Sequence, residues 1–353
     1  MKYLLAVLLS LNSSVILAHV EHHDTNIRFK SNKSDQSEFV TEIKQLVNKA
    51  KASRDEKSYK KVLSKIKIEE VLNPVLFLYK ADAQQYFHQF DEALYTLELA
   101  TELPGAGLMK ANILMTQGRF NEAINVCRQL VGKIDEVLAI TCYSHAISLN
   151  GQLKKGYDVL STFAKSIEIQ REKDLQWSYA VLGEMAERLN EVDNAEKYYS
   201  KALKIDANDV SSRIALSDIL IDQKRFDDVI KLTDKNLRYD PILLRYVRAL
   251  NIQGDKRMNG YFCELKRRVL SYQNKKEHLH YDTKSEYQLY FTDDLEAAMK
   301  DIQQHWNQQK LPRDARLISK VGVLKGEFDV LDEVRQWQLT NRLEDRVLTK
   351  ILN

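Results

Sequence analysis

The chain has 353 residues, of which 44% are hydrophobic and 29% are charged, so it contains enough apolar material for a sizeable core. Only 11 glycines and 4 prolines occur, and this scarcity argues against a β-sandwich or β-barrel, because those folds need many tight turns. The formal net charge of +3 lies too close to balance to indicate a nucleic-acid partner for the whole chain. Leu, Ala, Lys, Glu, Gln and Arg are abundant, and because these residues lose little freedom in a helix, the composition predicts an all-α fold.

Residues 1–18 have the features of a secretory signal peptide. Lys2 gives a short positive region, an apolar run covers residues 4–11, and Ala18 fits the position before a cleavage site. The apolar run is shorter than the roughly 20 residues that span a bilayer, and no later segment is long and apolar enough to do so. We therefore expect a periplasmic or secreted protein that is cleaved after Ala18 and has no transmembrane segment in its mature form. Peripheral contact with a membrane is compatible with this expectation.

Residues 19–36 are polar and lack helical periodicity, which predicts a flexible leader. This leader contains His19, His22 and His23, and imidazoles can bind copper, nickel or zinc. A flexible segment does not preorganise ligands, so an unstructured leader is the preferred interpretation and no metal is expected. Metal handling is kept as the alternative function. From 37 to 73, apolar residues recur at three- and four-residue steps, which is typical of two amphipathic helices that form an N-terminal helical cap.

A longer repeat of bulky and small apolar residues runs through residues 74–241. Bulky apolar residues that are expected to begin helices are separated by 30, 33, 39 and 34 positions, with a mean of 34: Phe90, Phe120, Leu153, Val192 and Phe226. In the clearest copy, Gly183 in the first helix and Ala195 in the second allow two antiparallel helices to approach closely, and Tyr199 fills the space beside them.

This pattern resembles the tetratricopeptide repeat, although Tyr179 and Arg213 stand where that family commonly has Trp. The resemblance implies a right-handed superhelical solenoid of antiparallel helix pairs. It also implies a non-catalytic scaffold or adaptor that binds a protein or peptide on its concave face without a cofactor. We expect residues 242–353 to form divergent helical repeats and a C-terminal cap, similar to those of uncharacterised bacterial envelope proteins of this type.

The first helix of each pair is expected to line the concave groove. Ten residues are predicted on this inner face: Tyr79, Asp82, Tyr86, Asn112, Met115, His145, Glu184, Arg188, Asp218 and Asp222. The best-known peptide receptors of the family hold a C-terminal carboxylate with a Lys and an Asn at matching positions, and Ala180 with Glu184 shows that this clamp is absent. Because aromatic residues and negative charges are mixed here, the groove is predicted to bind an extended or helical segment with basic and apolar residues.

A basic stretch follows the repeats: Lys256, Arg257, Lys266, Arg267, Arg268, Lys275 and Lys276. A solvated helix surface is the preferred interpretation, and anionic lipid headgroups, anionic glycans or an acidic protein face are the alternatives.

The three cysteines and the absence of catalytic motifs bear on the remaining hypotheses. Cys127 and Cys142 fall on neighbouring elements, where they either form a disulfide in an oxidising compartment or are free core residues. Cys263 is left over. The sequence contains no nucleotide-binding glycine motif, no GxSxG and no HExxH, so an enzyme is expected only if its site is hidden in the C-terminal half.

Overall fold

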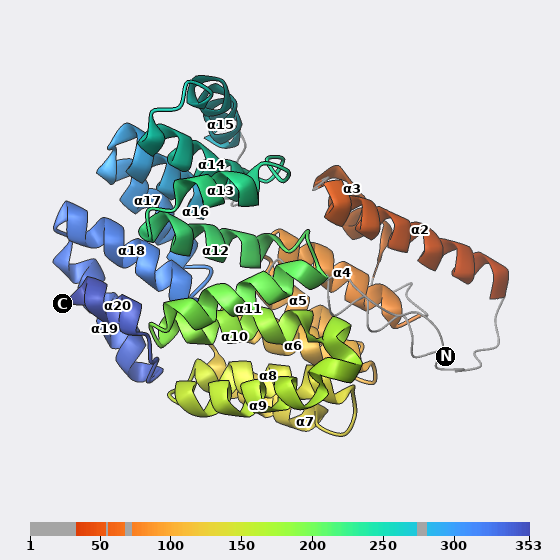
Figure 1. Ribbon diagram of the computed structural model, residues 1–353. Helices are drawn as coiled ribbons and strands as arrows, with labels where there is room; N and C mark the ends of the chain where they lie inside the picture. Colours follow the sequence, from red (N-terminus) through yellow and green to blue (C-terminus); the bar gives the residue numbers. More distant parts are fainter. Residues whose placement is uncertain (1–32, 54–55, 68–72, 274–280) are drawn as a thin grey trace.

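The computed structural model describes residues 33–53, 56–67, 73–273 and 281–353. These residues form helices and contain no strand, and successive helices pack against each other as antiparallel pairs (Figure 1). The prediction of an all-α solenoid of antiparallel helix pairs is therefore confirmed. Within the described residues, no helix has the length and apolar character that are needed to cross a membrane.

The helices follow one another in a regular order. They are α2 (Lys33–Ser53), α3 (Glu56–Lys65), α4 (Val75–Tyr86), α5 (Phe90–Glu98), α6 (Pro104–Thr116), α7 (Phe120–Leu130), α8 (Glu136–Ser148), α9 (Leu153–Arg171), the 3₁₀-helix η2 (Glu172–Leu175), α10 (Gln176–Arg188), α11 (Val192–Ile205), α12 (Val210–Asp222), α13 (Phe226–Thr233), α14 (Asp240–Gln253), α15 (Met258–Gln273), α16 (Tyr281–Tyr287), the π-helix η3 (Gln288–Thr292), α17 (Leu295–Trp306), α18 (Pro312–Lys325), α19 (Phe328–Thr340) and α20 (Arg346–Leu352).

The five bulky residues that recur with a mean spacing of 34 positions begin the second helix of five successive pairs. Helices α5, α7, α9, α11 and α13 start at these positions, as predicted. Several other helices start after an aspartate whose side chain accepts a hydrogen bond from the first turn, as at Asp135, Asp209, Asp294 and Asp345. Such caps satisfy backbone N–H groups that have no partner within the helix. Helix α16 is not predicted by the sequence, because its seven residues are too few to show periodicity.

Close packing within a pair depends on small side chains, and α10 with α11 shows this most clearly. A Cβ atom added at Gly183 would lie 2.7 Å from the ring of Tyr199, so the aromatic ring occupies the space that a larger residue would need. Ala195 and Ala202 of α11 are fully buried in the same interface. The sequence-based interpretation of these residues is confirmed.

A disulfide joins α7 to α8. Cys127 and Cys142 are bonded, their Cα atoms are 5.5 Å apart, and both side chains are fully buried. Of the two alternatives that the sequence left open, the structure contains the bridge, while Cys263 on α15 is free and exposed. The bond cross-links two consecutive helix pairs at the side of the solenoid where the C-terminal helices return.

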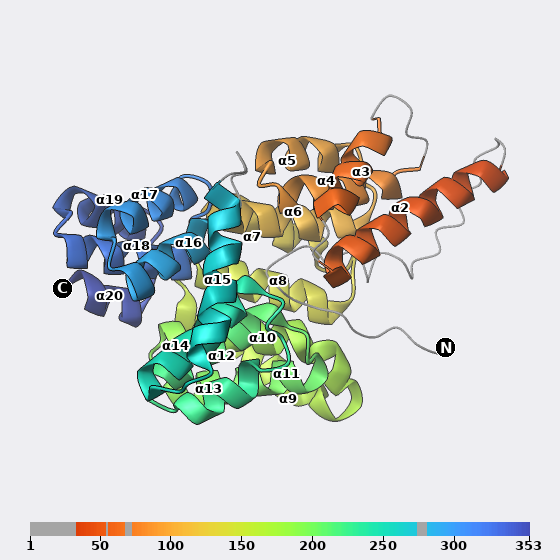
Figure 2. The ribbon, with the colours of Figure 1, turned by 90° about the horizontal axis from the view of Figure 1, so that it is seen from above.

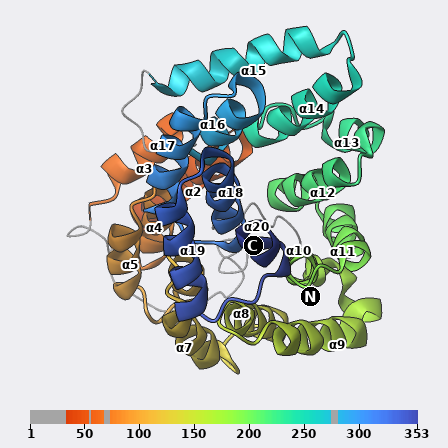
Figure 3. The same ribbon diagram turned by 90° about the vertical axis from the view of Figure 1, so that its left-hand side faces the viewer.

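The solenoid curves until its C-terminal helices meet the first half of the chain (Figures 1 and 3). The backbone N–H of Lys310 donates to the carbonyl of Thr116 at 2.8 Å, and the ring centroids of Phe120 and Trp337 are 6.2 Å apart. Gly118 has a φ of +76° at this contact, and a Cβ there would lie 3.3 Å from the Trp337 indole nitrogen. One hydrophobic cluster therefore contains residues of α2 to α8 together with residues of η3 and of α17 to α20.

Helices α2 and α3 lie at the N-terminal edge and pack against α4 (Figure 2). Their inner residues Ile43, Val47 and Val62 are buried, so this edge covers the first helix pair.

We predict that Ala195→Glu lowers the free energy of unfolding by about 3 kcal/mol or more, because it places an unpaired carboxylate between α10 and α11. Urea unfolding followed by circular dichroism measures the change. The matched control is Asn194→Glu, which puts the same side chain on the exposed neighbouring position and is expected to change stability by less than about 0.5 kcal/mol. Equal stabilities of the two variants would contradict the packing described here.

Thiol titration tests the disulfide. The denatured but unreduced protein is expected to show one reactive thiol, that of Cys263, and the reduced protein three. Reduction is expected to lower the free energy of unfolding by about 3 kcal/mol, since the bridge closes a short loop. Three reactive thiols before reduction, in protein prepared under oxidising conditions, would show that the bridge does not form.

Candidate functional site

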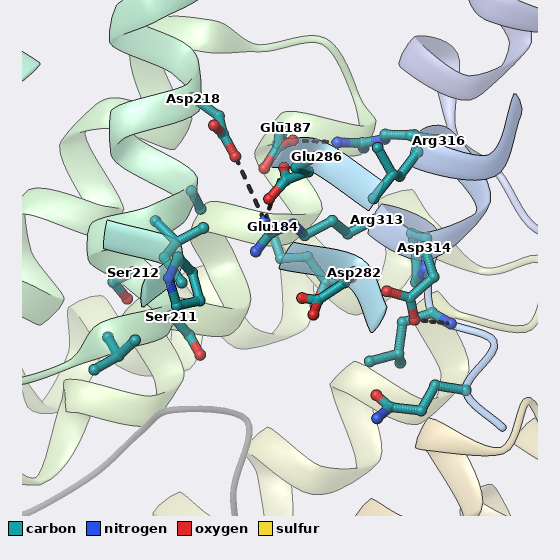
Figure 4. A pocket seen from close by; sticks show the side chains of 18 of the residues that line it. Glu184, Glu187, Ser211, Ser212, Asp218, Asp282, Glu286, Arg313, Asp314 and Arg316 are labelled. Atoms are coloured by element: carbon teal, nitrogen blue, oxygen red, sulfur yellow. Dashed lines mark hydrogen bonds and ion pairs between the residues drawn. The ribbon is translucent and has the colours of Figure 1, made fainter. Parts of the chain in front are cut away.

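The inner helices of the closed solenoid frame a cavity of about 450 Å³. Residues of α4, α8, α10, α12, α14, α16, α18 and α20 line it, so its walls come from both halves of the chain. Figure 4 shows side chains from these walls pointing toward one another across the cavity. The volume lies within the range of roughly 300–1,000 Å³ that is typical of ligand pockets.

Acidic residues outnumber basic ones in the cavity wall. Its lining has seven carboxylates against four Lys and Arg side chains: Glu184, Glu187, Asp218, Asp222, Asp282, Glu286 and Asp314 against Arg248, Arg313, Arg316 and Lys320. Aromatic side chains stand between them, namely Tyr86, Phe90, Trp177, Tyr199 and Tyr290. The lining itself thus has more carboxylates than Lys and Arg side chains, with aromatic residues between them.

A buried arginine joins three helices behind this wall. Arg245 of α14 is fully buried and donates to Asp218 of α12 through two hydrogen bonds of 2.8 Å. It also donates to Glu286 of α16 at 2.6 and 3.0 Å. Burial alone would lower the pKa of Arg245, but the two carboxylates outweigh it and raise that pKa above its ordinary value. Such a buried bidentate pair fixes the relative positions of the helices that carry it.

A second arginine connects α10, α18 and α20. Arg316 pairs with Glu187 and donates from Nε to Asp345 at 2.8 Å. Asp345 also accepts from the backbone N–H of Leu348 and so caps α20. Burial raises the pKa of Glu187 although the positive charge of Arg316 opposes the rise. The C-terminal helices are therefore tied to the first half by ionic contacts as well as by apolar packing.

Glu184 lies at the centre of a third charged group. Its Oε2 is 2.8 Å from Nε2 of His145, and its Oε1 is 3.2 Å from Nε of Arg188. Burial raises the pKa of Glu184, but the charges of His145 and Arg188 outweigh burial and lower it to about 2. Arg188 in turn donates to the carbonyl and the hydroxyl of Ser148 on α8. Glu184 is thus an ionised carboxylate that is held in place.

Four side chains in the cavity wall have a buried polar atom without a hydrogen-bond partner among the described residues, namely Gln85, His145, Glu184 and Ser212. The Oε1 atom of Gln85 and the Nδ1 atom of His145 are buried without a hydrogen-bond partner, and the two residues are 6% and 2% exposed. Buried polar atoms are usually satisfied, so these atoms indicate a wall that can accept further polar contacts.

Two histidines of the cavity lining, His88 and His305, make hydrogen bonds with residues of the segment 305–314, which connects α17 to α18. Nδ1 of His88 donates to Gln308 at 2.8 Å, and Gln309 donates to Nε2 of the same ring at 3.1 Å. Burial lowers the pKa of His88, so the ring is neutral, as this pair of bonds requires. His305 lies 3.0 Å from Asp314, which also accepts from the backbone N–H of Leu311 and caps α18. Burial lowers the pKa of His305, but the charge of Asp314 outweighs it and raises the pKa to about 8.

The structure brings half of the predicted groove residues to the cavity. Tyr86, His145, Glu184, Asp218 and Asp222 line it. The other five lie elsewhere. Met115 and Arg188 are buried between helices, and Asn112 is half-buried on α6 outside the cavity lining.

Tyr79 and Asp82 lie beneath the N-terminal edge. Asp82 is fully buried, with its Oδ2 3.2 Å from Nζ of Lys51 on α2 and 3.4 Å from the hydroxyl of Tyr59 on α3. These two residues are not accessible groove residues, because the cap packs over the inner face of the first pair.

Sequence reasoning missed Glu286, Arg313 and Arg316. Arg313, Arg316 and Lys320 recur at three- and four-residue steps along α18, which begins at Pro312, so the sequence contains a signal that they share one face. Glu286 gave no such signal, because it lies on the short helix α16.

The basic stretch carries internal ion pairs. Arg257 is bonded to Asp255, and Arg267 and Arg268 are bonded to Glu264. Lys256 and Lys266 are exposed. Lys275, Lys276 and the candidate metal residues His19, His22 and His23 lie outside the described residues. Among the described residues no group of three or more His, Cys, Asp or Glu side chains is arranged to hold a metal ion.

Comparison with known proteins places a repeat in the middle of the chain. Residues 178–209, which contain the clearest copy found in the sequence, match the family described as tetratricopeptide repeat. The prediction of this repeat is confirmed there. No curated protein matches the chain.

Solved structures that are similar to this chain include three with low sequence identity. The Cut9–Hcn1 hetero-tetramer of the APC/C is 12% identical with a TM-score of 0.49, over 91% of this chain and 63% of that one, so the chain spans less than two thirds of its length. Yeast Tom70 is 14% identical with a TM-score of 0.41, over 97% and 80% of the two chains. A tetratricopeptide repeat protein from Parabacteroides merdae is 14% identical with a TM-score of 0.37, over 84% and 100%. Such identities bring no function from those proteins to this chain.

The His305–Asp314 contact predicts a dependence of stability on pH. Since the folded pKa of about 8 exceeds the ordinary value of 6.5, the contact stabilises the fold fully below pH 6.5 and is lost as the pH rises through 8. The free energy of unfolding of wild type minus that of His305→Gln gives the contribution of the contact. This difference should be about 2 kcal/mol larger at pH 6 than at pH 9.5. Urea titrations at both pH values measure this difference. Asp314→Asn is expected to abolish the same pH dependence, and a difference that does not change with pH would refute the contact.

Proposed function

We propose that this tetratricopeptide-repeat protein is a non-catalytic scaffold that binds a segment of another protein in the cavity between its inner helices. The segment is extended and carries basic and apolar residues. The observation that carries the proposal is the composition of the lining, which includes seven carboxylates, four Lys and Arg side chains and five aromatic residues around one cavity. Paired helices that present an inner surface to a polypeptide are a common mode of recognition for repeat proteins.

The charges of the wall support binding rather than chemistry. Glu184, Glu187 and Asp218 each have a basic partner in the fold, so each serves to set the shape and potential of the cavity. Asp222 lines the cavity beside them, and burial and the nearby Asp218 raise its pKa. A basic side chain that enters the cavity would interact with the carboxylates of the lining, and the aromatic residues of the lining would pack against its neighbours.

A location outside the cytoplasm accords with the disulfide. Bridges such as Cys127–Cys142 persist in oxidising compartments and are rare in the cytosol. Together with the signal-like residues 1–18, this supports a periplasmic or secreted scaffold that connects components of the cell envelope.

Filling the cavity tests the proposal without breaking an ion pair. We predict that Ala215→Trp, which places an indole in the lining of α12, reduces the recovery of a cross-linked partner from the native envelope about tenfold, which corresponds to about 1.4 kcal/mol. Quantitative mass spectrometry of photo-cross-linked samples measures the recovery.

The matched control is Ala207→Trp, which adds the same side chain at an exposed position outside the lining. It is expected to leave recovery unchanged. Helicity and melting temperature of both variants must equal those of wild type. Undiminished recovery with a folded Ala215→Trp protein would show that the partner binds elsewhere.

A further inference from the structure

Arg313 differs from Arg316, the other arginine of α18 in the cavity lining, in the length of its contacts with carboxylates and in its exposure to solvent. It comes from the first turn of α18, and its side chain extends across the cavity toward α12 and α16 (Figure 4). Its Nη2 is 3.9 Å from Asp218 and 3.6 Å from Glu286. Both distances exceed those of ordinary N–H···O hydrogen bonds, so Arg313 is attracted to the two carboxylates without being bonded to them.

The same two carboxylates are already bonded to Arg245. That guanidinium makes hydrogen bonds of 2.6 to 3.0 Å and is fully buried, whereas 42% of the Arg313 side chain is exposed. Arg245 therefore supports the structure, and Arg313 is a second, weakly held cation on the accessible side of the pair. Exposed ion pairs contribute little to stability, so displacing Arg313 costs little.

The neighbouring Arg316 provides a contrast on the same helix. It is 13% exposed, pairs with Glu187 and is hydrogen-bonded to Asp345, and these contacts tie α18 to α10 and α20. Among the described residues of α18, only Arg313 reaches across the cavity to two carboxylates that another residue already holds in place. Its side chain is also exposed to solvent.

We propose that Arg313 is an internal competitor for the basic side chain of the partner. It occupies the acidic face formed by Asp218 and Glu286, and a guanidinium or ammonium group of the bound segment replaces it. This inference rests on the proposed function and names its regulation. Arg313 therefore competes for the two carboxylates, and a partner binds there only when its basic residue and the apolar residues beside it together outcompete Arg313.

The inference predicts that removing an arginine strengthens the binding of a basic ligand. The probe is a fluorescein-labelled peptide of alternating leucine and arginine residues, titrated with the mature protein and followed by fluorescence polarisation. Arg313→Ala is expected to bind it about tenfold more tightly than wild type, because it frees both space and negative potential. Arg313→Gln, which keeps most of the side-chain volume, is expected to show a smaller gain.

Arg225→Ala is the matched control, because its side chain has the same 42% exposure and pairs with Glu196 and Asp228 outside the cavity lining. It removes the same charge and is expected to change the dissociation constant less than twofold. A peptide with glutamate in place of arginine is expected to gain nothing from Arg313→Ala.

Equal or weaker binding of the basic peptide by Arg313→Ala, an equal gain with Arg225→Ala, or no binding by any of these proteins would overturn the competitor role. Such a failure is distinguishable from failure of the proposed function. If Ala215→Trp still loses the native partner, the cavity remains the binding site and only the role of Arg313 is wrong. If that variant keeps the partner, the cavity itself is not the binding site.

Discussion

The close approach of two helices within each pair is the constraint on which the rest of this structure depends. Gly183 opposite Tyr199 sets that approach in α10 and α11, because no Cβ atom fits between them. When each pair packs tightly in the same sense, the small rotation between neighbouring pairs accumulates along the chain. Here it accumulates until Trp337 meets Phe120 and the backbone of Lys310 bonds to Thr116. The enclosed cavity is a consequence of this closure.

Closure also changes the energetics of the inner surface. In an open solenoid the carboxylates of the inner helices would face water, whereas here Glu187 and Asp218 keep only part of their side chains exposed and have basic partners. The chain supplies Arg316 and Arg245, and each links helices that are distant in sequence. The loss of one member of such a pair leaves an uncompensated buried charge, so these residues hold the walls rigidly. Arg313 makes no hydrogen bond to a buried carboxylate that would lose its only partner if Arg313 moved. We therefore infer that Arg313 is the residue of the wall that a ligand displaces.

Much of the fold could be predicted from the sequence, because it depends on local signals. A bulky residue at the start of the second helix of each pair is visible in one chain, and these residues placed the starts of α5, α7, α9, α11 and α13 correctly. The inner-face position of Glu184 and Asp218 follows from the same periodicity. Burial of Asp82 under α2 and α3 could not be predicted, because the cap does not share the repeat pattern. Glu286 could not be predicted either, since its partner Arg245 is 41 positions away in the chain.

The dimensions of the cavity narrow the kind of partner that the sequence suggested. An open groove would accept an amphipathic helix about 10 Å across along its whole length. A cavity of about 450 Å³, with Arg313 reaching across it, has room for a few side chains and the short stretch of backbone that carries them. An extended segment presents alternate side chains to opposite walls, so a basic residue can face Asp218 while an apolar neighbour faces Trp177. The proposed function therefore favours a short linear segment as the partner, selected by charge and apolar contact together within one small space.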